Sequence, residues 1–110
     1  MDRRRAGPTA GVIVERLVDA AGWFVVALRT NEGFQQALYD ELADTLRTCA
    51  VAWSGADSIP RQAVNVMVDP VPATHAAAEA YPEPQRQRIY DAGYELHDLL
   101  TECTTDAPNP

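Results

Sequence analysis

Lysine is absent from this sequence of 110 residues, and cysteine, histidine and tryptophan occur only twice each. Two cysteines are too few for the disulfide framework that holds many small secreted domains together. His75 and Glu79 lie four residues apart, but no second pair at metal-ligand spacing accompanies them, and a zinc site needs three or four protein ligands. We therefore expect neither a metal ion nor another cofactor.

Long apolar runs are also missing. The most apolar stretch, 12–28, is interrupted by three charged residues, and its longest uncharged part covers only residues 20–28. A membrane-spanning helix needs roughly 20 apolar residues, so we expect no contact with a membrane. No apolar run directly follows the three arginines at 3–5, so we expect no signal peptide and a cytoplasmic protein. Secretion without a cleaved signal peptide is the alternative.

Basic residues are few, because nine arginines stand against sixteen aspartates and glutamates, and the net charge is -7. This balance opposes binding to phosphates, so we expect no nucleic-acid partner. The chain is long enough for one domain with its own core, and its 46% hydrophobic content is too high for a disordered chain. We expect a single helical domain over residues 8–104, with flexible tails at 1–7 and 105–110.

Prolines divide the chain, because helix interiors exclude them. Between the prolines, apolar residues recur at helical spacing over 12–29, 34–53 and about 83–103, which predicts three long helices. Segments 59–68 and 74–80 add one or two short helices. The sequence therefore predicts an all-α fold, an antiparallel bundle of three long helices with one or two short ones.

Two segments leave a different fold class open as an alternative. Residues 23–29 are rich in aromatic and β-branched side chains, and over 63–68 valine alternates with other residues. Short strands at these places would make the fold α+β, which is the alternative. Among the local signals, Asn31 suits the start of the second long helix, Pro70 and Pro72 are expected to end the segment before them, and Thr74 suits the start of the next.

Cys49 and Cys103 fall on the apolar faces of the second and the last predicted long helices. This position favours two buried free thiols in a reducing compartment. The alternative is a disulfide that joins the two helices.

Binding residues are sought first among the aromatic side chains, because tryptophan and tyrosine often anchor binding surfaces. Tyr90 and Tyr94 share one face of the last helix. The candidates are Trp23, Phe24, Trp53, Tyr90, Tyr94 and His97. Gly93 lies between the two tyrosines, and a glycine within a helix permits a neighbouring helix or a ligand to approach closely.

The helix predicted over 12–28 is apolar nearly all round. Such a helix is either central in a bundle or covered by a second chain. The sequence contains no catalytic motif, so we assign no catalytic residue and favour a non-enzymatic role. We expect a small acidic protein–protein interaction module, an adaptor, inhibitor or regulator, that forms a homodimer through this region.

A small apolar ligand is the alternative partner. Trp23 and Phe24 from the first helix and Tyr90 and Tyr94 from the last would line its pocket, and the protein would be a binder or an enzyme for that ligand.

Two short motifs add a second alternative. Trp53-Ser54-Gly55 lies between helical segments, and Tyr94-Glu95-Leu96-His97-Asp98 fits the pattern Tyr-x-x-x-Asp/Glu near the end of the chain. Together they resemble the Trp-x-Gly helical-hairpin family, the small acidic substrates of type VII secretion. The resemblance implies dimers of helical hairpins and a secretion signal that contains Tyr94. The prolines between residues 60 and 84 depart from that family, whose second helix is long.

Overall fold

The structure, a computed structural model, describes residues 10–54, 56 and 58–104. These residues form five helices: α1 (Ala10–Arg29), α2 (Gln36–Trp53), α3 (Arg61–Met67), α4 (Pro70–Ala78) and α5 (Gln85–Thr104). The predicted all-α fold with three long and two short helices is confirmed. The α+β alternative is wrong, because 23–29 and 63–68 are helical or end a helix and the described residues contain no strand. The tails predicted at 1–7 and 105–110 lie outside the described residues.

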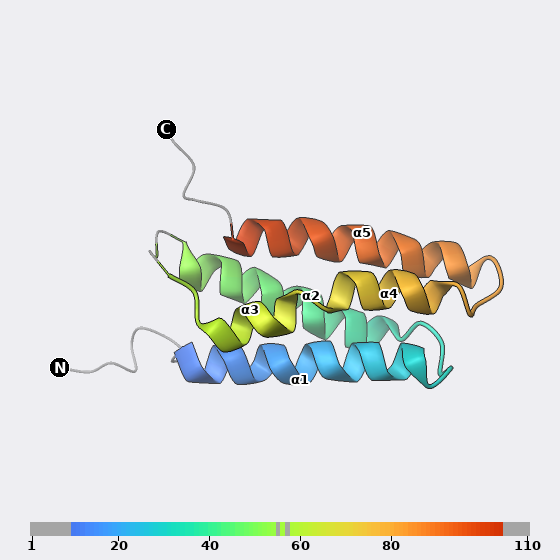
Figure 1. The fold of residues 1–110 in the computed structure, drawn as a ribbon, viewed down its shortest axis with the longest axis horizontal. Helices are drawn as coiled ribbons and strands as arrows, with labels where there is room; N and C mark the ends of the chain where they lie inside the picture. The colour runs from blue at the N-terminus through green and yellow to red at the C-terminus, as the bar shows by residue number, and fades with distance from the viewer. Residues whose placement is uncertain (1–9, 55, 57, 105–110) are drawn as a thin grey trace.

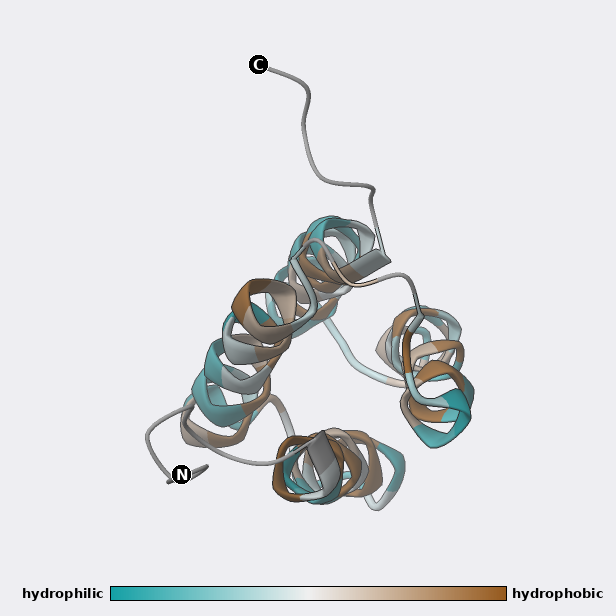
Figure 2. Ribbon diagram, turned by 90° about the vertical axis from the view of Figure 1, so that its left-hand side faces the viewer, coloured by the Kyte–Doolittle hydropathy of each residue, from teal (hydrophilic) through white to brown (hydrophobic). Residues whose placement is uncertain are grey.

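The helices form a bundle in which consecutive long segments run in opposite directions (Figure 1). α1 and α2 form one antiparallel hairpin. α3 and α4 follow each other along one edge like a single broken helix, and α5 returns beside α4. Viewed end-on, α1, α2, α5 and the α3–α4 pair stand at the four corners (Figure 2).

α2 and α5 lie side by side and run in the same direction. The side chain of Gln85 at the start of α5 accepts a hydrogen bond from the Phe34 amide just before α2, at 2.8 Å. Near the other end, the Cys103 thiol donates to the Leu46 carbonyl at 3.2 Å. Cys49 and Cys103 are both buried and free, which confirms the free thiols and not the disulfide.

The core runs along the axis of the bundle. An aromatic group at one end joins Phe24 of α1 to Phe34 and Tyr39, with ring centroids 5.7–6.0 Å apart. The remaining large side chains that are almost fully buried come from α1, α2 and α5: Leu17, Leu42, Leu46, Ile89 and Leu96. Because each long helix places residues three and four apart on its inner side, the apolar stripes read from the sequence meet here.

Tyr81 closes the loop between α1 and α2. Its hydroxyl donates to the Leu28 carbonyl at 2.7 Å and accepts from the Gly33 amide at 3.1 Å. The expected role of Asn31 at the start of α2 is wrong, because Gln35 precedes that helix. Asn31 and Gly33 instead have left-handed backbones, with φ of 64° and 89°, which asparagine and glycine tolerate best.

The junction of α3 and α4 corrects two further local predictions. Pro70 does not merely end the preceding segment but occupies the first turn of α4, where a missing N–H costs nothing. Thr74 does not start a helix; it lies in the middle of α4, fully buried, and its hydroxyl has no hydrogen-bond partner. The fourth corner of the bundle is therefore interrupted after Met67, opposite the middle of α1.

Candidate functional site

The outer face of α1 leaves large apolar side chains in contact with solvent. Trp23 is 66% exposed and Val26 is 50% exposed, whereas Phe24 between them is fully buried. Successive helical residues point about 100° apart, so the apolar side chains of α1 project in many directions. The neighbouring helices cover only some of these directions. Figure 2 shows hydrophobic segments of α1 on the side turned away from the other helices. Val12, at 46% exposed, extends the same face toward the start of the helix.

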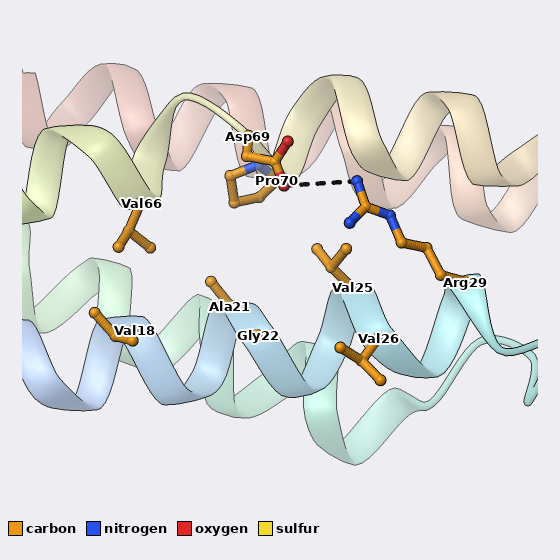
Figure 3. Close-up of a pocket in the computed structure, with 9 residues that line it drawn as sticks. All are labelled: Val18, Ala21, Gly22, Val25, Val26, Arg29, Val66, Asp69 and Pro70. Carbon is orange, nitrogen blue, oxygen red and sulfur yellow. Dashed lines mark ion pairs between the residues drawn. The ribbon is translucent and has the colours of Figure 1, made fainter.

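A groove lies beside this face, where α1 passes the junction of α3 and α4 (Figure 3). It has a volume of about 220 Å³ and is open to solvent. Most of its wall is apolar: Val18, Ala21, Gly22, Val25 and Val26 on α1, with Val66 and Pro70 opposite. The groove exists because the α3–α4 pair is interrupted opposite the middle of α1. At this interruption the apolar side chains that face α1 are those of Val66 and Pro70.

An ion pair marks one end of the groove. Arg29 Nη2 of α1 lies 3.8 Å from Asp69 Oδ2, and both side chains are more than half exposed. Such a pair contributes little to stability in water. Arg29 also lines a second shallow hollow of about 300 Å³, which continues between the end of α1 and α4 and is lined mainly by alanines of α4. We call the outer face of α1, with the groove beside it, the α1 surface.

Two of the glycines within helices have opposite surroundings. A methyl group added at Gly22, in the wall of the groove, would meet no atom within 4 Å. A methyl group added at Gly93 of α5 would overlap the ring of His75. The close neighbour that the sequence predicts for Gly93 is therefore His75 of α4, whereas the described residues give no structural reason for Gly22.

His75 packs between the two tyrosines of α5. Its ring centroid lies 5.5 Å from that of Tyr90 and 4.7 Å from that of Tyr94. Its Nε2 atom is buried and has no hydrogen-bond partner. The spacing of His75 and Glu79 suggests only a metal ligand, whereas the packing role of His75 follows from Gly93 opposite it. The described residues contain no group of three or more potential metal ligands.

The candidate binding residues lie in separate environments. Trp23 is on the α1 surface, Phe24 is in the core, and Tyr90 and Tyr94 flank His75, so the structure does not gather these four around one pocket. Trp53, at the end of α2, belongs to the core. His97 is exposed on α5, with its Nδ1 atom 3.9 Å from Asp98.

A polar cluster at the edge of the core joins α2 to α5. The Tyr39 hydroxyl donates to Glu95 Oε1 at 2.6 Å, and the Arg88 guanidinium lies over the Phe34 ring at 4.4 Å. Burial, and then the hydrogen bond and negative charge of Glu95, raise the pKa of Tyr39 above its ordinary range. Arg88 also lies 3.9 Å from Glu95, so these residues link α2 to α5.

Comparison of the chain with models of protein families, with curated proteins and with solved structures gave no match. No helix within the described ranges has the length and apolar character needed to cross a membrane. Function is therefore inferred from the geometry of the α1 surface alone.

Proposed function

We propose that this protein is a non-enzymatic protein–protein interaction module, an adaptor, inhibitor or regulator, and that it docks through the α1 surface. One observation carries the proposal: Trp23 is 66% exposed next to an open apolar groove. Tryptophan dominates the binding energy of many interfaces, and contiguous exposed apolar area marks places where proteins associate. When a partner covers an exposed apolar surface of this kind, apolar area leaves water and the free energy falls.

The cysteines support a role without nucleophilic catalysis. Burial raises the pKa of the Cys49 thiol to about 11 and that of Cys103 to about 12. Both thiols are therefore protonated near neutral pH, and a protonated thiol is a weak nucleophile. The groove also lacks a candidate catalytic acid or base among its lining residues. Its only charged side chains are Arg29 and Asp69, which pair with each other.

Affinity isolation from the protein's own cells, with quantitative mass spectrometry, tests the proposal. We compare the wild type with Trp23→Ala on the α1 surface and with Val51→Ala on α2. Val51 is 78% exposed, so this control also removes exposed apolar area but at another place. We expect a stoichiometric protein, or a second copy of the chain, to be recovered with the wild type and with Val51→Ala and to be lost with Trp23→Ala. Equal recovery with all three would contradict the proposal.

Secretion by the type VII route is a second candidate, supported by the accessibility of the Tyr-x-x-x-Asp motif. Tyr94 is 61% exposed and the Asp98 side chain 84% exposed on α5, so a secretion receptor can reach both. Secretion predicts the protein in the culture medium, and its loss from the medium with Tyr94→Ala. Detection in the cell pellet alone would exclude this route.

A further inference from the structure

Building on the proposed function, we infer that the partner of the α1 surface is a second copy of this chain. The two α1 helices pack antiparallel, and a two-fold axis passes at Gly22. Three observations carry this arrangement: the open glycine, the order of charges along α1, and the position of Trp23 beside the axis.

Gly22 lies in the middle of α1, where glycine is a poor helix former. A methyl group there would meet nothing within 4 Å, so the single chain does not require a glycine. A missing side chain on an exposed helix face permits another backbone to approach closely. On this face the approaching element comes from outside the chain.

The charges on α1 complement those of an antiparallel copy. Glu15, Gly22 and Arg29 are seven residues apart, two helical turns, and so project from one side of the helix. Glu15 and Arg29 each lie about 10 Å from Gly22 at 1.5 Å per residue. A two-fold axis at Gly22 therefore sets Glu15 of each copy against Arg29 of the other, beside the exposed 3.8 Å contact of Arg29 with Asp69 of its own chain. A parallel pair would set like charges together, which opposes association.

The same axis pairs the apolar residues of the α1 surface. Each residue faces the one at the same distance on the other side of Gly22, so Val18 faces Val26 of the second copy. A two-fold rotation keeps matching flanks of the two helices on one side of the pair. Trp23 projects about 100° from Gly22, so the two Trp23 side chains lie on the same flank of the pair, where they can pack on each other and reduce their contact with water.

A charge exchange tests the antiparallel register. Glu15→Arg gives a copy with positive charges at both ends of the contact, and Arg29→Glu gives one with negative charges at both ends. Alone, each variant places like charges together, and we expect its dimer to dissociate at a concentration more than about tenfold higher than the wild type. Mixed in equal amounts, the two variants pair oppositely at both ends and regain the wild-type affinity.

Sedimentation equilibrium reports the mass in each case. The wild type is expected at about 24 kDa, two chains of 12.0 kDa, and each single variant closer to one chain. The mixture serves as its own folding control, because it contains only the two variant chains. A mixture that associates no better than its components would overturn the register.

Cross-linking locates the axis. A residue on a two-fold axis faces itself in the other copy, so Gly22→Cys is expected to form a disulfide-linked dimer under mild oxidation. Val51→Cys on α2, which is also exposed but lies away from the α1 surface, is expected to stay monomeric, and the buried native cysteines do not compete. Absence of the Gly22→Cys dimer would overturn the arrangement.

Failure of this inference can be told apart from failure of the proposed function. A wild type that stays at 12.0 kDa at every concentration, but still binds another protein through Trp23, overturns the self-association and leaves the docking surface standing. A wild type with neither self-association nor a Trp23-dependent partner overturns both.

Discussion

Gly22 and Gly93 both lie within helices, but their surroundings differ, and so do the expected effects of replacing them. Gly93 leaves room for the ring of His75, whereas Gly22 leaves room that nothing in the described chain fills. We expect Gly93→Ala to lower the free energy of unfolding by about 1–3 kcal/mol, because the added methyl forces His75 out of its place between two tyrosines. Gly22→Ala is expected to raise it by up to about 1 kcal/mol, because alanine favours the helix.

Urea unfolding followed by circular dichroism measures both changes. The measurements belong in a Trp23→Ala background, so that association does not add to stability. The double variant His75→Ala/Gly93→Ala is the control, since removal of the ring makes space for the methyl group. A Gly93→Ala protein as stable as its parent would contradict the close packing of His75.

The buried thiols predict a loss of stability at alkaline pH. Burial raises the pKa of Cys49 to about 11 and that of Cys103 to about 12, from an ordinary value of 9.0. Above about pH 9 the unfolded chain loses these protons first, so the folded protein binds more protons and its stability falls as the pH rises toward the folded pKa values. Below about pH 9 the thiols are protonated in both states, and their contribution to stability is fully present.

Urea unfolding between about pH 7 and pH 10.5 checks the sign of this effect. The double variant Cys49→Ala/Cys103→Ala is expected to show a shallower decline, with the remainder arising from Tyr39, whose pKa is also raised by burial. Stability that rises from pH 9 upward would show that the thiols are not buried as described.

At the scale of elements, α1 is a helix with two apolar sides, one buried and one exposed. Phe24 is fully buried and its neighbour Trp23 is 66% exposed. We expect Phe24→Ala to cost about 3–5 kcal/mol of unfolding free energy, because it opens a cavity in the core. Trp23→Ala is expected to change the stability of the single chain by less than about 1 kcal/mol. Equal losses would contradict the division between a core side and a docking side.

The long helices could be predicted from the sequence, because their apolar residues repeat every three or four positions and prolines separate them. The short α3 could not be told from a strand in this way, since valine alternates with other residues over 64–68. In the structure Ala63 and Met67, four apart, are the buried residues, and no strand among the described residues offers α3 a partner.

The candidate site could be predicted only in part. Trp23 stood among the candidates because it is one of the few aromatic residues, and tryptophan often anchors binding surfaces. The groove could not be predicted, because it depends on Pro70 starting a new helix opposite Gly22, and sequence rules allow a proline either to end a helix or to begin one. His75 was missed as a packing partner, since its contact with Gly93 joins two helices.

At the scale of the whole molecule, the bundle covers α1 on two sides, with α2 on one and the α3–α4 pair on the other (Figures 1 and 2). The helix has 20 residues and a length of about 30 Å, so its uncovered side offers a long strip to a partner. The net charge of -7 opposes nonspecific association of the chain. In the proposed dimer, specificity comes from the local order of apolar and charged residues along α1.

The fluorescence of Trp23 over a dilution series tests the central claim most directly. In a Trp53→Phe variant Trp23 is the only tryptophan, so the emission reports whether the α1 surface is covered. We predict a blue-shifted emission at high concentration that moves to the red on dilution, in step with the fall in mass from two chains to one. Emission typical of a water-exposed tryptophan at every concentration would contradict self-association through α1.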